Sequence, residues 1–248
     1  MDKEKLREKA LSDTKEELRS EVDRDRILVK AVKQLDQLND NINTEVERLR
    51  DWYSLHFPEL EEEISDNEHF VNILSRGINR NELEAFSDMA ATSTGMALTE
   101  EDEKMIEDMV KSISDRIKLR DQIENYVSNG VKEEMSNLSK LLDPLLAARL
   151  VGLAGSLDDL AKKPASTVQM LGAEKALFRY LRGNGTPPKH GIIFEHEFVN
   201  QLPEDSRGKM ARFLANKASI AARLDNYGDK EKGEQLREEC REKFQSLK

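Results

Sequence analysis

The fold of this chain is decided between residues 26 and 52, which read RILVKAVKQLDQLNDNINTEVERLRDW. This stretch contains no Gly or Pro, and its apolar residues recur every seven positions in two rows. The first row is Leu28, Leu35, Ile42 and Leu49; the second is Ala31, Leu38 and Trp52, with Glu45 interrupting it. Two such rows repeat every 3.5 residues, which is typical of a coiled coil.

A second seam of the same kind lies between Thr99 and Asn129. Thr99 and the acids after it resemble a helix start, because a hydroxyl caps free amides and acids favour the first turn. The apolar positions of this seam are Ile106, Val110, Ile113, Ile117, Ile123 and Val127, with Arg120 and Glu124 interrupting it. Pro58 ends the first helix, since proline cannot continue a helix interior. We therefore predict an antiparallel coiled-coil hairpin; the alternative is two ordinary helices packed on a globular core.

The two predicted long helices are joined by residues 59–98, which indicate shorter helices at 60–74 and 81–89. Gly130 is expected to end the second long helix, and leucines at helical spacing then continue to Leu160. Later segments predict helices at 173–182 and 204–227, a loop at 183–189 and a short extended piece at 192–194. The predicted fold class is all-α. Its parts are a charged N-terminal extension (1–21), a coiled-coil domain with a helical insertion (22–130), a helical domain (131–227) and a C-terminal tail (228–248) that is a charged helix with little to bury.

Composition excludes several classes of protein. Charged residues make up 35% of the 248, hydrophobic residues 38% and aromatic residues 5%, which fits long exposed helices with one modest globular core. No apolar run is long enough to span a bilayer, so no membrane role is expected. Residues 1–11 are charged throughout and do not resemble a secretory signal. The single cysteine, Cys240, excludes an internal disulfide and fits a reducing compartment. We therefore expect a cytoplasmic protein.

Residues 162–224 form a basic block in an acidic chain. The block holds 11 Lys+Arg against 5 Asp+Glu, a balance of +6, whereas the whole chain carries −10. A structured segment whose charge opposes that of the rest predicts a polyanionic partner, and nucleic acid fits best.

Two helices of this block carry rows of cations. Lys175, Arg179 and Arg182 share one face of the helix at 173–182, while Leu177 and Phe178 are expected to serve the core. On the helix at 204–227 the cations of one arc are Lys209, Arg212 and Arg223, and Lys217 falls within the neighbouring apolar stripe. Such rows suit phosphate contacts. The alternative is a solvated face whose long side chains cover apolar surface.

His190 and His196 flank the short apolar piece at 192–194. The loop before them, residues 184–189, contains Lys189 and is expected to approach RNA bases, because unstacked bases favour His, Arg and aromatic surfaces. The spacing of the two histidines and the lack of a nearby Cys argue against a zinc site. Phosphate-binding loops, dinucleotide fingerprints, nucleophile elbows and zinc-hydrolase motifs are missing from the sequence. We therefore expect no catalytic residues, no metal and no cofactor.

Three segments resemble the core signature of the Nop domain, in the order and spacing of that family. They are PASTVQMLGAEKALFR (164–179), TPPKHGIIFEH (186–196) and RGKMARFLANKASIAARLD (207–225). Residues 25–60, ending in WYSLHFPEL, look like the first coiled-coil helix of the archaeal members. The resemblance covers roughly residues 22–227.

The resemblance implies the core of a box C/D small RNA–protein particle, which guides 2′-O-methylation of RNA. In such a particle the Nop domain grips a kink-turn RNA already bound by a kink-turn-binding protein. The expected RNA contacts are Lys175, Arg179, Lys189, His196, Lys209, Arg212 and Arg223. The coiled coil of the family pairs two copies, so self-association or pairing with a full-length homologue is expected through Leu28, Leu35, Leu38, Ile42, Leu49, Ile106, Ile113 and Ile117.

The sequence departs from the family pattern before the coiled coil. Only residues 1–21 stand where the family has a domain that holds the methyltransferase fibrillarin, and they cannot form a core of that size. Fibrillarin binding is therefore not carried over to this chain. The alternative function is that of a truncated paralogue, which acts as a coiled-coil dimerisation scaffold or regulator without recruiting the methyltransferase.

Overall fold

The computed structural model describes residues 3–20, 24–228 and 231–248, and every regular element in them is a helix. The predicted all-α class is thus confirmed. The chain forms two compact units, residues 34–124 (the hairpin unit) and residues 1–33 with 125–248 (the bundle unit). This division falls inside the two long helices, whereas the sequence placed a boundary at residue 130. No helix of the described ranges is both long and apolar enough to cross a membrane.

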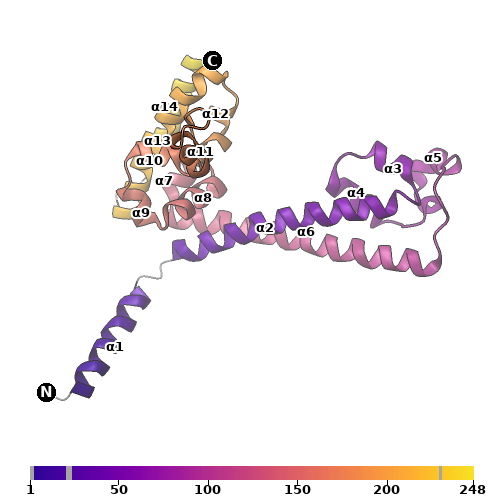
Figure 1. Cartoon of the computed structure of the whole chain (residues 1–248), viewed down its shortest axis with the longest axis horizontal. Coiled ribbons are helices and arrows are strands. Elements are labelled where there is room, and N and C mark those ends of the chain that lie inside the picture. The colour runs from indigo at the N-terminus through magenta and orange to yellow at the C-terminus, as the bar shows by residue number, and fades with distance from the viewer. Residues whose placement is uncertain (1–2, 21–23, 229–230) are drawn as a thin grey trace. The chain divides into compact units, whose positions relative to one another are not determined.

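The hairpin unit is built on two antiparallel helices, α2 (Arg24–Tyr53) and α6 (Glu100–Glu134), which Figure 1 shows side by side. Their seam residues form one buried cluster: Leu38, Ile42, Val46, Leu49, Ile106, Val110 and Ile113, with Ile117 and Ile123 packed against it. Each fully buried aliphatic side chain of this kind contributes about 1.5–3 kcal/mol to folding. Trp52, predicted in the second row, is exposed, and Tyr53 takes the core position beside it. Glu45, which interrupts the row, pairs with Arg116 of α6.

The connection between the long helices folds onto them as short turns. Its elements are α3 (Pro58–Glu63), α4 (Asn67–Leu74), the 3-10 turns η1 (Arg80–Glu82) and η2 (Glu84–Phe86), and α5 (Ser87–Ala91). The helix predicted at 60–74 is thus two helices, because Asp66 caps α4 by accepting a hydrogen bond from the His69 amide at 2.7 Å. The helix predicted at 81–89 is replaced by η1, η2 and the start of α5.

Arg80 and His56 fix the end of this connection against α2. Arg80 Nη1 donates to the carbonyls of His56 and Gly95, each at 2.7 Å, and the His56 ring bonds to the Met96 carbonyl at 2.7 Å. A Cβ on Gly95 would lie 2.0 Å from the His56 oxygen, so only glycine permits this approach. The segment that leads into α6 is therefore held by buried polar groups as well as by apolar packing.

The sequence suggested that Gly130 ends the second long helix, but the helix continues past it. α6 continues to Glu134, and in the bundle unit a Cβ on Gly130 would lie 2.5 Å from a methyl carbon of Leu28. Glycine here serves the close approach of α2 and α6.

The bundle unit surrounds α13 (Glu204–Tyr227), which packs against α7, α9, α10 and α14 (Figure 1). The buried face of α13 is rich in alanine, which lets neighbouring helices approach closely: Ala211, Ala215, Ala218, Ala221 and Ala222. The other elements are α1 (Lys3–Ser20), α7 (Ser136–Leu142), α8 (Pro144–Ala154), α9 (Leu157–Lys162), α10 (Ala165–Met170), α11 (Glu174–Leu181), η3 (Ile192–Glu195), α12 (Glu197–Asn200) and α14 (Gly233–Leu247). Residues 192–194, predicted as extended, belong to the 3-10 turn η3.

The C-terminal segment belongs to this core, contrary to the predicted tail with little to bury. Leu236, Cys240 and Phe244 recur every four residues along α14 and are buried. Phe244 stacks on Phe198 of α12 with ring centroids 5.3 Å apart. Burial raises the pKa of the Cys240 thiol to about 12, so the thiolate form is suppressed.

Candidate nucleic-acid interface

The helix α11 lies on the surface of the bundle unit with none of its residues buried. Leu171 before it and Ile193 after the loop are buried. Leu177 and Phe178 were expected in the core, but they are 36% and 62% exposed, and Leu181 is 68% exposed. That expectation was wrong. An eight-residue helix with uncovered apolar side chains is typical of a contact surface rather than of a core element.

The cations and the apolar residues of α11 occupy different sides of the helix. At about 100° per residue, Lys175, Arg179 and Arg182 fall within roughly 60° of arc. Leu177 and Leu181 lie roughly opposite them. All five side chains are exposed. This helix can therefore contact an anion on one side and an apolar surface on the other.

The loop at 183–191 is held beside α11 by backbone pairing. The Gly191 amide donates to the Gln169 carbonyl at 2.8 Å, and the Ile192 amide donates to the Leu171 carbonyl at 2.8 Å. The Gln169 side chain in turn donates to the Lys189 carbonyl at 2.6 Å. A Cβ on Gly191 would lie 1.8 Å from the Leu171 oxygen, so a glycine is required at this position. The loop base is thus joined to the turn from which α11 starts.

A planar stack lies at the foot of the loop. His190 stacks on Phe194 with ring centroids 4.7 Å apart and an interplanar angle of 11°. Arg207 of α13 lies over the Phe194 ring, 5.4 Å from its centroid. Burial, assisted by the Arg207 charge, lowers the pKa of His190, so the ring is neutral near pH 7. Sequence reasoning named His190 but missed Phe194 and Arg207, which only the fold brings together.

The cations predicted on α13 and in the loop differ in whether their side chains already bind other groups of the protein. Lys209 and Arg212 are exposed. Lys189 lies near the first turns of α13 and pairs with Glu204 at 3.5 Å. Arg223 is also exposed, but its Nε donates to the Ala161 carbonyl at the end of α9, at 3.0 Å. It stands 14 residues beyond Lys209, roughly 21 Å along the helix.

Two predicted positions are engaged in the fold. His196 is only 2% exposed; its Nδ1 accepts the Phe198 amide at 3.1 Å and its Nε2 bonds to the Leu141 carbonyl at 3.1 Å. Burial lowers its pKa, so it is a neutral structural cap of α12. Lys217 pairs with Glu239 of α14 and lies 5.2 Å from the Phe213 ring. We therefore leave both out of the candidate surface.

The family of this chain is established by a match to a family sequence model that covers most of the chain. The sequence model described as "Nop: snoRNA binding domain, fibrillarin" matches residues 34–246. The chain belongs to the Nop family. An uncharacterised NOP5 family protein of Methanocaldococcus jannaschii is 39% identical over 220 residues, which are 83% of this chain and 53% of the relative. Human nucleolar protein 56 is 36% identical over 241 residues, which are 89% of this chain and 41% of the relative.

This Nop family member thus spans about half, or less, of the length of these curated relatives. Among solved structures, the crystal structure of a fibrillarin/Nop5p complex matches with a TM-score of 0.58 and 29% identity. The match covers 98% of this chain and 78% of that one. The resemblance stated from the sequence motifs is confirmed.

The residues predicted for dimerisation of this Nop protein lie inside one chain. Leu38, Ile42, Leu49, Ile106 and Ile113 are buried in the hairpin unit and Ile117 is partly buried there; Leu28 and Leu35 are also buried. All of them except Ile117 are thus buried within the single chain. Pairing of two copies through the coiled coil stays a prediction.

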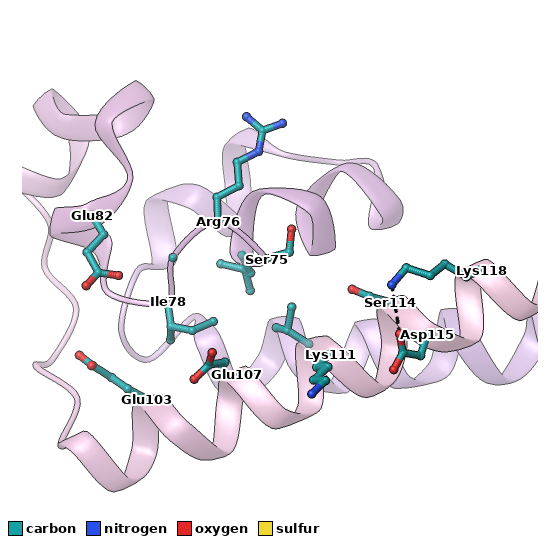
Figure 2. A pocket seen from close by; sticks show the side chains of 13 residues that line it. Ser75, Arg76, Ile78, Glu82, Glu103, Glu107, Lys111, Ser114, Asp115 and Lys118 are labelled. Carbon is teal, nitrogen blue, oxygen red and sulfur yellow. Dashed lines mark hydrogen bonds and ion pairs between the residues drawn. The ribbon is translucent and has the colours of Figure 1, made fainter.

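The hairpin unit of this Nop protein also carries an open groove of about 590 Å³ (Figure 2). Glu82, Glu103 and Glu107 gather toward one end, whereas Lys118 pairs with Asp115 toward the other. No His or Cys lines it. Within the described ranges, no group of three or more His, Cys, Asp or Glu is placed to hold a metal ion. We assign no reaction to this groove.

Proposed function

We propose that this chain is an RNA-binding assembly protein of a box C/D-type particle. In this proposal its bundle unit binds a kink-turn RNA together with the kink-turn-binding protein, in support of guided 2′-O-methylation. The family membership supports a role in such particles generally. The finer assignment is supported by the surface that α11, the loop at 183–191 and the first turns of α13 form together.

One observation carries the proposal, namely that α11 exposes a cationic side and an apolar side at once. Phe178 and Leu181 are 62% and 68% exposed, and the cations Lys175 and Arg179 are exposed on the other side of the helix from Leu181. Exposed apolar area of this kind is usually covered by a partner. RNA phosphates satisfy the cations but not the leucines, so a ligand that combines RNA and protein fits this helix better than either alone.

The stack of His190, Phe194 and Arg207 supplies a second kind of contact. Proteins recognise the unpaired bases of bent RNA by stacking them on aromatic rings and guanidinium planes. His190 is half-buried and neutral, so it presents a ring face without the cost of removing water from a charge. We infer that a splayed base of the RNA stacks at this point, while Lys209 and Arg212 contact phosphates nearby.

The experiment is a gel shift of a kink-turn RNA, with and without the kink-turn-binding protein. We expect a supershift by this chain only in the lane that contains the partner. Lys175→Glu with Arg179→Glu should remove the supershift, and so should Leu177→Ser with Leu181→Ser, because each pair removes one side of the composite contact. The matched control is Lys104→Glu with Lys111→Glu, two exposed cations of the hairpin unit. A wild-type chain that shifts neither lane would reject the proposal.

The alternative, a dimerisation scaffold or regulator, has its own supporting observation in the hairpin unit. Trp52, Leu55 and Met96 are exposed apolar residues, and the Met96 amide donates to the Leu55 carbonyl at 2.8 Å. If these three side chains pack against a second copy or a full-length homologue, Leu55→Ser with Met96→Ser should abolish co-purification with that homologue. If the chain is a regulator, adding the wild-type chain should lower the methylation activity of the homologue. Unchanged activity would reject a regulatory role.

A further inference from the structure

A row of cations that sequence reasoning did not single out lies at the start of α2. Arg26, Lys30 and Lys33 follow one another at four and three residues, so they share one face of the helix over about 10 Å. All three side chains are exposed. Within the described part of the chain none of them makes an ion pair, whereas their neighbour Arg24 pairs with Glu133 at 3.1 Å.

The net charge of the neighbouring sequence distinguishes this row from an ordinary solvated helix face. Residues 34–124 carry 9 Lys+Arg against 23 Asp+Glu, a balance of −14. Residues 24–33 carry 4 Lys+Arg against 1 Asp, a balance of +3. The sign therefore reverses within α2, at the point where it enters the bundle unit. Three unpaired like charges repel one another, and an anionic ligand relieves that repulsion.

An adjacent face of the same helix segment holds the row in a fixed orientation. The Asp25 carboxylate accepts the Leu157 amide at 2.8 Å and so caps α9. Val29 packs against Gly152 of α8, whose Cβ position lies 3.0 Å from a Val29 methyl carbon. The cations are thus presented from a rigid part of the bundle unit, which lowers the entropy lost when they bind.

A short path through α8 connects the row with the candidate interface. The Cβ position of Gly152 lies 3.8 Å from Lys33 Cε. The next residue, Leu153, lies with its methyl carbon 3.3 Å from the Cβ position of Gly172, in the turn from which α11 starts. Two consecutive residues of α8 therefore separate Lys33 from the base of α11.

We propose that Arg26, Lys30 and Lys33 bind phosphodiester oxygens of the RNA duplex that continues beyond the segment bound at α11. The inference rests on the proposed function, because it takes the α11 surface as the primary RNA site. Successive phosphates of one strand advance about 3.4 Å along B-form DNA, and those of an A-form RNA duplex are no farther apart along the axis, so a row of about 10 Å is long enough to meet three of them. Contacts of this kind are independent of base sequence.

The test compares the wild-type chain with a triple variant, Arg26→Gln, Lys30→Gln and Lys33→Gln. Affinity is measured against salt for three RNAs: the minimal kink-turn RNA with its binding protein, the same RNA with a duplex extension at each end, and a plain duplex. The matched control is Lys104→Gln, Lys111→Gln and Lys118→Gln, which removes three cations of equal charge from α6.

We expect the triple variant to bind the minimal RNA as the wild type does. On the extended RNA and on the plain duplex its salt slope should fall by about 2–3, since each lost phosphate contact removes about 0.9. The control variant should keep the wild-type slopes. Equal slopes for the wild type and the triple variant on both duplex-containing RNAs would overturn the inference.

The three RNAs separate failure of this inference from failure of the proposed function. A wild type that does not bind the minimal RNA rejects the proposed function, and the plain duplex then still tests the row. If the triple variant keeps all RNA slopes but loses the kink-turn-binding protein in a pull-down without RNA, the row is a protein contact, and the phosphate assignment is wrong.

Discussion

The carboxylate of Asp225, near the end of α13, caps the start of α7 through Asn137. Its Oδ1 accepts the Asn137 amide at 2.9 Å and the Asn137 side-chain nitrogen at 2.8 Å, while Oδ2 accepts the Leu138 amide at 2.9 Å. Asn137 Oδ1 in turn accepts the Lys232 amide at 2.8 Å, just before α14. The Asn137 side chain thus connects α7 with the end of α13 and with the start of α14, which are far apart in the sequence.

Replacing Asp225 with Ala should destabilise the bundle unit by about 2–4 kcal/mol, because several donors in the core lose their acceptor and each costs about 1–3 kcal/mol. The free energy of unfolding from urea titration measures this. Glu242→Ala removes an exposed acid of α14 and serves as the control. Equal stability of the Asp225 variant and the wild type would contradict the capping role.

Two phenylalanines of the bundle unit should respond oppositely to truncation. Phe178 is exposed on α11, so Phe178→Ala should leave the melting temperature unchanged and weaken partner-dependent RNA binding. Phe198 is buried and stacks on Phe244, so Phe198→Ala should cost about 3–5 kcal/mol of stability. Thermal melts of both variants, with the gel shift for Phe178→Ala, make the comparison. A large loss of stability in Phe178→Ala would show that the Phe178 ring packs in the core.

Acid should loosen the connection in the hairpin unit through Glu59. The Thr94 amide and the Ser93 hydroxyl donate to its carboxylate at 2.8 and 2.7 Å, and they lower its pKa from 4.5 to about 2. Since the folded-state pKa is the lower one, this contribution to stability is complete above about pH 4.5 and is lost as the pH falls toward 2. Melts of wild type and Glu59→Gln between pH 6 and 2.5 should show a weaker pH dependence in the variant. Glu62→Gln is the exposed control and should behave as the wild type.

The parts of the fold that follow from the sequence are those with a long, strict period. The seams of α2 and α6 and the bounds of α13 follow directly from spacing, because many positions agree on one face. α11 has only eight residues, and its apolar side chains look the same in a sequence whether a core or a partner covers them. The helical character of the C-terminal segment was predicted, but its burial was missed because the charge density of α14 hid three apolar residues at spacing four: Leu236, Cys240 and Phe244.

Parts of the candidate site depend on contacts that spacing does not encode. The cations of α11 were named from the sequence because they recur on one face. The stack of His190, Phe194 and Arg207 joins a loop to α13, and the hydrogen bond from the Ile192 amide to the Leu171 carbonyl joins that loop to the turn before α11. His196 was named for its residue type, and only its burial identifies it as a cap of α12.

The two arginines predicted on α13 should separate RNA binding from stability. Arg212 is exposed, so Arg212→Glu should weaken RNA binding with an unchanged melting temperature. Arg223 donates to the Ala161 carbonyl, so Arg223→Glu should lower the melting temperature as well, by removing a hydrogen bond that a charged donor makes worth about 1.5–3 kcal/mol. Melts and salt titrations of both variants test this. If Arg212→Glu binds RNA as the wild type does, Arg212 is not part of the interface.

The attachment of the loop at 183–191 should control RNA binding through a single glycine. In Gly191→Ala the new methyl group would meet the Leu171 oxygen at 1.8 Å, and because that oxygen is backbone the loop has to move away. His190 would then leave Phe194, and the affinity for the kink-turn RNA with its partner should fall by about tenfold, the loss of one base stack worth roughly 1–3 kcal/mol. Gly208→Ala is the matched control, since its methyl group would meet Lys189 at an ordinary 3.6 Å. If both variants bind equally well, the loop does not take part in recognition, and the interface consists of α11 and α13 alone.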